Sequence, residues 1–201
     1  MEKNWIAGSE SDLSHVRLVI LLNHTSLYEP LFLQGFPLQF LWKVSRKIVA
    51  PGADKTLDRP IVGFFWKLMA PGIISITRKR DKSWFKFLEL IHSDHMVMIA
   101  PEGRMKRQNG LDSSGRPMSV RSGVAEIISE LSDGKILIGY SGGLHHVQHP
   151  GENFPRLFKT IKMNLEILDI DQYKASFKSE GIPFRRNIVR DLEVRLQKNI
   201  P

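Results

Sequence analysis

The sequence predicts an α/β fold built around a mostly parallel sheet. Short apolar runs rich in β-branched residues alternate with longer stretches whose apolar positions recur at helical spacing. The 201 residues suffice for one domain with a sizeable core and are too few for two ordinary ones. We therefore expect a single domain over residues 1–201, with a mostly parallel mixed sheet flanked by helices.

Six segments have the composition of strands. The nearly continuous apolar run at 16–22 is typical of a strand buried on both faces of a sheet. The segment 163–170 alternates apolar and polar side chains, as a half-exposed strand does. The remaining strands are expected at 39–44, 73–77, 96–100 and 135–140.

Helices are expected between these strands. A proline at position 30, which is favourable in a first helical turn, predicts a helix over 30–35. Residues 81–92 carry apolar side chains on one helical face, with an aspartate at the start. Further helices are expected at 60–69, 120–131 and 183–198, the last of them basic and amphipathic.

The chain is basic and contains no cysteine. Lys and Arg number 29 against 21 Asp and Glu, which gives a formal net charge of +8. Such a surface favours anionic partners, namely nucleic acid, anionic lipid or phosphorylated small molecules. The missing cysteine excludes disulfides, thiolate nucleophiles and cysteine-ligated zinc.

Two further patterns concern membranes. Residues 1–14 are polar, so we expect no secretory signal there. The most apolar stretch, 60–76, is broken by two glycines and a proline and falls short of the about 20 apolar residues that a membrane-spanning helix needs. It suits a buried or an interfacial helix, and the residues we expect to contact a membrane surface are Phe64, Phe65, Trp66 and Lys67.

The first candidate for chemistry follows the strand at 16–22. His24 and Glu29 lie five positions apart, and Pro30 disfavours helical geometry in the residue before it. The segment between them is therefore predicted to be a turn in which the carboxylate reaches a ring nitrogen. A histidine held in this way has a fixed tautomer and raised basicity, which suits a general base near neutral pH. The alternative is a histidine bonded to a loop backbone group.

Two cationic segments also follow predicted strands. A Pro-Glu-Gly tripeptide at 101–103 precedes three cations in four residues, where glycine permits close backbone approach and the cations can bind an anion. The segment 72–78 begins with glycine and ends in Arg78, whose guanidinium can bind phosphate in a bidentate manner. Taken singly, the first matches a solvated charged loop, which is what most such runs are, and Arg78 is better explained as a cation at the rim of a basic protein.

Together, the three segments resemble a known family. The order His-x4-acid, Gly-x-Ile-x-Ile-x-Arg and Pro-Glu-Gly is that of the signature blocks of glycerolipid acyltransferases related to lysophosphatidic acid acyltransferase. Residues 122–128 and 136–139 loosely resemble the fourth block of the family. The similarity covers about 16–145, and the predicted strand and basic helix within 160–198 add nothing recognisable.

The resemblance implies an O-acyltransferase of phospholipid biosynthesis. His24 looks like the base that takes a proton from an acceptor hydroxyl, which then attacks the thioester of acyl-CoA or acyl-carrier protein. Glu29 stands where most of the family has Asp and looks like the acid that orients the base. No covalent acyl-enzyme, cofactor or metal is implied.

The resemblance also implies partners and a location. The acceptor would be a (lyso)phospholipid or a glycerol-phosphate-like molecule, and the protein would be cytoplasmic and peripherally associated with the inner face of a membrane. Nucleic acid is not an expected partner. The residues that would hold the anionic head group are Arg78, Glu102, Gly103, Arg104, Lys106 and Arg107.

This chain departs from the family pattern at the third segment. The family usually has Phe-Pro-Glu-Gly-Thr-Arg, whereas Ala100 precedes the proline here and Arg104-Met105 replaces Thr-Arg. The arginine that holds the acceptor phosphate in the family is thus absent from its place. Arg104, Lys106 or Arg107 can substitute, and a different acceptor is equally compatible with the sequence.

Two other functions are open. A serine hydrolase is suggested by Gly-x-Ser-x-Gly at 139–143, with Ser141 as the nucleophile, but that fold needs an acid and then a histidine downstream. No acid lies between Ser141 and the histidines that follow it, so the required order is not met. The other candidate is a basic module that binds membrane or nucleic acid through the helix at 183–198 without catalysis.

A histidine cluster follows Ser141. His145 and His149 lie four apart and would share a face of a helix, which suggests a metal site, but the glycines and the proline around them favour a surface loop. With His146, they could instead line an acyl or acceptor pocket if the loop lies over the carboxyl edge of the sheet.

Overall fold

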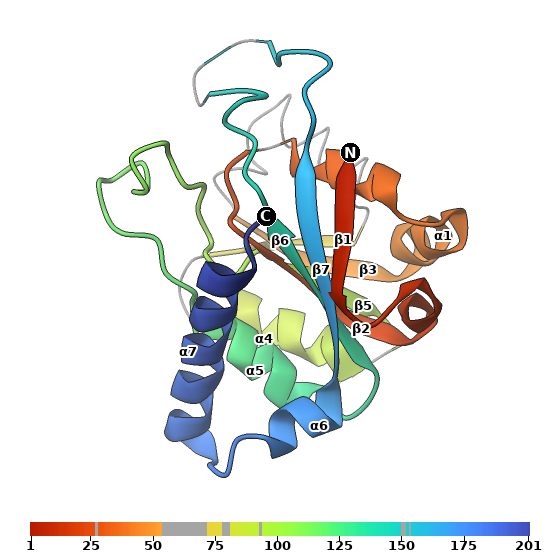
Figure 1. The fold of residues 1–201 in the computed structure, drawn as a ribbon. Coiled ribbons are helices and arrows are strands. Elements are labelled where there is room, and N and C mark those ends of the chain that lie inside the picture. The colour runs from red at the N-terminus through yellow and green to blue at the C-terminus, as the bar shows by residue number, and fades with distance from the viewer. Residues whose placement is uncertain (27, 54–71, 78–80, 93, 150–151, 153) are drawn as a thin grey trace.

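The computed structural model describes residues 1–26, 28–53, 72–77, 81–92, 94–149, 152 and 154–201, which form an α/β domain (Figure 1). In this part of the chain, seven strands form one sheet in the order β1-β7-β6-β2-β5-β3-β4. Helices cover both faces of the sheet. The predicted fold class, a mostly parallel mixed sheet flanked by helices, is confirmed.

The central strand follows the most apolar part of the sequence. β2 (Val16–Leu22) lies between β5 and β6, and most of its side chains are buried, as its apolar run predicts. The other strands are β1 (Glu2–Ala7), β3 (Ile48–Ala53), β4 (Ile73–Ile76), β5 (Met96–Ile99), β6 (Lys135–Ser141) and β7 (Lys162–Asp169).

Strand direction decides where the loops lie. β2 is parallel to β5 and to β6, and β3 is parallel to β5 and to β4. β7 runs antiparallel to β6, and β1 is parallel to β7. The loops after β2, β5 and β6 therefore begin side by side at one edge, which is where parallel sheets place their sites.

Among the described residues, four α-helices cover one face of the sheet: α4 (Lys82–Glu89), α5 (Gly123–Glu130), α6 (Ile170–Ala175) and α7 (Gly181–Asn199) (Figure 1). Asp81 caps α4 by accepting the backbone N–H of Ser83 at 2.9 Å, which agrees with the predicted helix start. The basic helix α7 buries Phe184, Ile188 and Leu192 in the core beneath it. Its apolar positions therefore serve packing.

The opposite face is covered by α1 (Leu38–Lys47) and two 3-10 helices, η1 (Glu10–His15) and η2 (Glu29–Gly35). A third 3-10 helix, η3 (Leu90–His92), follows α4. A second buried cluster lies between α1, η1, η2 and the sheet, and it includes Leu13, Phe32, Phe40 and Val44.

One predicted strand is wrong. Residues 39–44 belong to the helix α1, in which Phe40 and Val44 are buried whereas Trp42 between them is 58% exposed. A strand would place all three side chains on one face, and a helix separates the middle one from the other two. The helix predicted over 30–35 is present as the 3-10 helix η2.

The sequence does not predict β1, β3 or α6. β1 is a mostly exposed strand at the edge of the sheet and half of its residues are polar, so it lacks the apolar run of a buried strand. β3 contains Pro51 and Gly52, which usually mark turns. Both strands are therefore specified by their neighbours in the sheet more than by their own composition.

Some predictions lie outside the described residues. These are the helix at 60–69, the membrane-contact residues Phe64, Phe65, Trp66 and Lys67, and the cation Arg78. Within the described ranges, no helix combines the length and the apolar character that crossing a bilayer requires.

Packing of α7 can be tested by truncation. Leu192 is fully buried, so Leu192→Ala should lower the free energy of unfolding by about 2–5 kcal/mol. Val194, two positions along the same helix, is 55% exposed, and Val194→Ala should change the free energy of unfolding by less than about 0.5 kcal/mol. Urea unfolding followed by circular dichroism measures both values, and equal values would contradict the packing role of α7.

Candidate active site

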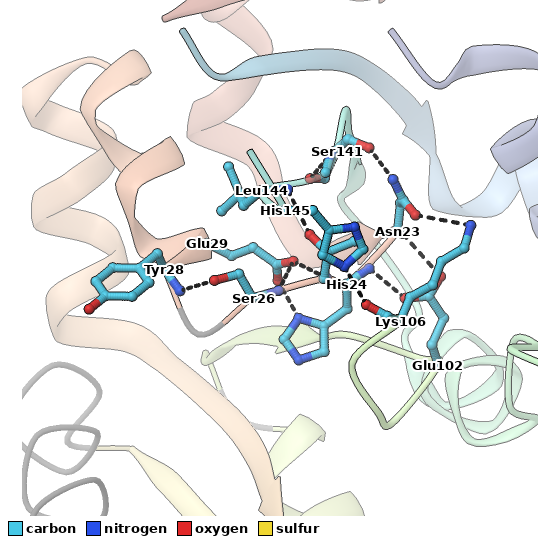
Figure 2. A network of polar contacts seen from close by, with 12 residues as sticks. Asn23, His24, Ser26, Tyr28, Glu29, Glu102, Lys106, Ser141, Leu144 and His145 are labelled. Atoms are coloured by element: carbon cyan, nitrogen blue, oxygen red, sulfur yellow. Dashed lines mark hydrogen bonds and ion pairs between the residues drawn. The ribbon is translucent and has the colours of Figure 1, made fainter. Parts of the chain in front are cut away.

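The loop after β2 brings His24 and Glu29 together (Figure 2). Glu29 opens η2 and is 6% exposed, and its carboxylate pairs with Nδ1 of His24. The second carboxylate oxygen accepts the backbone N–H of Thr25 at 2.7 Å. Because a carboxylate only accepts hydrogen bonds, it holds the ring proton on Nδ1 and leaves Nε2 as the basic nitrogen when the ring is neutral.

The surroundings of His24 make the ring more basic. Burial lowers the pKa of His24, but the charge of Glu29 and its hydrogen bond to the ring raise it, and the charge of Glu102 adds to them. The pKa of His24 therefore lies above its ordinary value of 6.5. A base of this strength suits proton abstraction near neutral pH.

Glu102 connects the loop after β5 to the loop after β2. Its side chain is 2% exposed, and its two carboxylate oxygens accept the backbone N–H groups of Asn23 at 3.0 Å and His24 at 2.7 Å. Burial raises the pKa of Glu102, and these two hydrogen bonds oppose that shift. The carboxylate thus faces the backbone of the histidine loop and fixes its position.

Asn23 and Lys106 extend this connection. Asn23 has a φ of +63°, in the left-handed region that Asn tolerates better than most residues. Its side-chain amide donates to the carbonyl of Ser141 at 2.7 Å and accepts from the Lys106 ammonium at 3.4 Å. The backbone N–H of Lys106 donates to the carbonyl of His24 at 2.7 Å (Figure 2).

The loop after β6 completes the network. The backbone N–H of Leu144 donates to the hydroxyl of Thr25 at 2.8 Å, and Nε2 of His145 donates to the carbonyl of Lys106 at 2.8 Å. Loops from three neighbouring strands thus hold the histidine segment. The sequence analysis did not assign roles to Asn23 and Thr25. The feature of the sequence that could have indicated them is their position on either side of His24.

A cavity of about 730 Å³ opens beside this network. His24, Glu29 and Glu102 line its polar part. Most of its wall is apolar and comes from the sheet, η2 and α1, including Val19, Phe32, Phe40, Leu137 and Met163. The cavity therefore combines a base with room for an apolar chain.

Arginines line the same cavity. Arg104 is paired with the buried carboxylate of Asp112, which also lies 3.7 Å from Nε of Arg116. Arg121 lines the cavity too, and no carboxylate among the described residues pairs with it. Its backbone N–H donates to the carbonyl of Pro101 at 2.9 Å, which ties it to the Pro-Glu-Gly loop.

Of the residues predicted to bind the head group, some line the cavity and others do not. Gly103, with a φ of +66°, lines the cavity together with Arg104 and Glu102. Lys106 and Arg107 do not appear among the described residues that form its wall. Their part in acceptor binding stays a prediction, as does that of Arg78.

Ser141, the nucleophile of the hydrolase alternative, is the last residue of β6, and the histidines of the suggested metal site lie in the loop that follows. Ser141 is buried, and its hydroxyl accepts the N–H of Gly143 at 3.0 Å. The rings of His145 and His149 stack with centroids 6.4 Å apart. Within the described ranges, no group of three or more potential ligand side chains is arranged to hold a metal ion.

Comparison with known proteins concerns the family and the fold of the chain. A family model described as Acyltransferase matches residues 7–139. Among solved structures, the chain is similar to the 1-acyl-sn-glycerophosphate (LPA) acyltransferase PlsC from Thermotoga maritima, with a TM-score of 0.57 and 14% identity. That match covers 98% of this chain and 72% of the other, and at this identity it shows the fold alone. No curated protein sequence matches the chain.

The basicity of His24 can be tested by NMR titration of its ring. We expect a midpoint above pH 6.5, which Glu29→Gln lowers because burial persists while the opposing charge is removed. Since folding raises this pKa, the pair stabilises the fold below pH 6.5 and loses that contribution as pH rises through the folded-state pKa.

Glu180→Gln, an exposed change at the start of α7, is the matched control and should leave the His24 titration unaltered. A wild-type midpoint below 6.5, or an equal effect of the two variants, would contradict the stated role of Glu29.

Proposed function

The chain belongs to the acyltransferase family, and from this premise we propose that it transfers a fatty acyl group from a thioester to the hydroxyl of a (lyso)phospholipid or glycerol-phosphate-like acceptor. The donor in this proposal is acyl-CoA or acyl-carrier protein, with no further cofactor. The observation that carries the proposal is the His24–Glu29 pair at the wall of a largely apolar cavity.

The pair has the arrangement of a general base and its orienting acid. Nε2 of His24 takes the proton of the acceptor hydroxyl as the oxygen attacks the thioester carbonyl carbon. The C–O bond forms, and the tetrahedral intermediate then breaks its C–S bond. The proton held on Nε2 passes to the departing thiolate, so the products are an ester and a free thiol. Glu29 stabilises the imidazolium between the two transfers.

The apolar part of the cavity suits the acyl chain. Phe32 and Phe40 from one side, with Leu137 and Met163 from the sheet, provide an apolar wall next to the polar part of the cavity that contains His24. Burying each methylene there contributes about 0.8 kcal/mol, so a long chain can be held by its length alone. This proposal assigns the chain to the sheet face that α1 and η2 cover.

The cationic part suits an anionic head group. Asp112 already neutralises Arg104 and lies near Arg116, so neither presents a full free charge to a ligand. Arg121 lies on the same wall without such a carboxylate among the described residues. We assign to Arg121 the main contact with the acceptor phosphate, which would compensate for the family arginine that is replaced by Met105 in this chain.

A peripheral position at the inner face of a membrane belongs to the same proposal, because a phospholipid product has to enter a bilayer. Phe64, Phe65, Trp66 and Lys67 stay predicted contacts with that surface.

The reaction is tested by measuring thiol release from a long-chain acyl-CoA with a panel of hydroxyl acceptors. His24→Ala should abolish it, and Glu29→Gln should lower kcat by about 10²–10⁴-fold. Because the neutral ring is the active form, kcat/KM should fall as pH drops through the raised pKa of His24. In Glu29→Gln that fall should move to lower pH.

The matched control is His15→Ala, which removes an exposed ring from η1 and should leave the rate unchanged. Full activity in His24→Ala would refute the base assignment, and absence of thiol release from the wild type with every acceptor would refute the reaction class.

Arg121 is tested by its effect on KM. Loss of one charge-assisted hydrogen bond should raise the KM of a phosphorylated acceptor about 10–100-fold in Arg121→Gln. The KM of the acyl donor should change less than about threefold. Arg186→Gln, an exposed arginine on α7, serves as the charge-matched control. Equal KM values in both variants would remove Arg121 from the acceptor site.

A further inference from the structure

The connection from β6 to β7 ends in an exposed apolar tip. Phe154, Leu157 and Phe158 are 83%, 71% and 102% exposed, and these are the three most exposed large hydrophobic side chains among the described residues. All three lie within five positions of sequence. We call residues 154–158 the β6–β7 tip.

Hydrogen bonds and buried side chains anchor the tip to the rest of the domain. The backbone N–H of Arg156 donates to the carbonyl of Val147 at 2.7 Å, and Nε2 of His146 donates to the carbonyl of Thr160 at 2.7 Å. Val147 and Ile161 are each 4% exposed and belong to the core beneath the loop. The apolar side chains therefore project from an anchored connection.

The tip lies at the same edge of the sheet as the candidate active site. The connection leaves the carboxyl end of β6, and Figure 1 shows it extending beyond that edge as the teal and light-blue trace. Its first residues bond directly to the site, through Leu144 to Thr25 and through His145 to Lys106. A surface that receives the tip would therefore face the entrance side of the His24 loop.

The charges around the tip are mainly positive. Arg156 and Lys159 lie within or beside it, and Lys162 follows at the start of β7. Glu152 is paired with Arg156 at 2.6 Å and Glu2 of β1 with Lys162 at 3.0 Å, which leaves the exposed Lys159 as the cation beside the tip that no carboxylate among the described residues pairs with. An apolar point beside an exposed, unpaired cation is complementary to an anionic lipid surface, which offers acyl chains beneath negative head groups.

The size of the tip also favours a lipid surface over a protein. A specific protein interface usually buries about 800 Å² on each partner and needs a matching shape. Five residues on a projecting loop do not by themselves form a surface with such a shape. Insertion into a bilayer needs no matching shape, because lipids rearrange around two aromatic rings and a leucine.

We propose that the β6–β7 tip inserts into the interfacial layer of an anionic bilayer and seats the edge of the sheet that carries His24 on the lipid surface. This inference rests on the proposed function only for the statement that the acceptor is a lipid. The tip would place the cavity entrance next to the layer that contains the acceptor head groups.

The test is sedimentation with vesicles of phosphatidylcholine and phosphatidylglycerol in equal amounts. The variant Leu157→Ser with Phe158→Ser keeps the charge and should lower the partition coefficient about 100-fold, because two side chains lose their burial in lipid. The control, Ile182→Ser with Val194→Ser, removes two exposed apolar side chains from α7 and should stay within threefold of the wild type. Circular dichroism verifies that both variants are folded.

Binding that is equally strong in the tip variant and the wild type would overturn the inference. So would a wild-type protein that self-associates without lipid, in sedimentation velocity, when the tip variant stays monomeric, because the tip would then bind a second copy.

A second measurement separates this inference from the proposed function. With a short-chain acyl-CoA and a water-soluble hydroxyl acceptor, the tip variant should keep the wild-type rate, whereas His24→Ala should not. A wild type that binds vesicles through the tip but transfers no acyl group from any donor would refute the proposed function and leave the tip assignment standing.

Discussion

The carboxylate of Glu102, buried between two strand ends, holds the candidate site together. It accepts the N–H groups of Asn23 and His24 at the point where the chain leaves the ladder of β2. Without it, these donors would be buried with no acceptor, which is costly. The parallel pairing of β2 with β5 sets the distance over which the carboxylate must reach. The position of His24 thus depends on strand pairing between segments far apart in the chain.

The cavity beside His24 has an apolar part and a cationic part. The sheet, η2 and α1 supply an apolar wall, and the loops at the edge of the sheet supply arginines with only partial neutralisation by Asp112. A molecule with an apolar tail, a reactive carbonyl and an anionic partner can therefore be bound with its reacting atoms near Nε2 of His24.

Sequence patterns predicted the features whose causes are local. The composition of β2 is apolar enough to identify it as a strand without its neighbours. The pairing of His24 with Glu29 follows from Pro30, which disfavours a helix between them. The strand expected at 39–44 failed because a short apolar run fits both periodicities. The bonds of Glu102 and Leu144 could not be predicted, since they join loops that only the folded sheet brings together.

The reversal of direction at β7 has a consequence for how such a protein can change over time. Because β6 and β7 are antiparallel neighbours, the connection between them begins and ends in the sheet, and both of its ends are fixed by pairing. Its outer part can then be lengthened, shortened or exchanged while His24 and Glu29 keep their places. Adaptation to a new surface is thereby uncoupled from preservation of the chemistry.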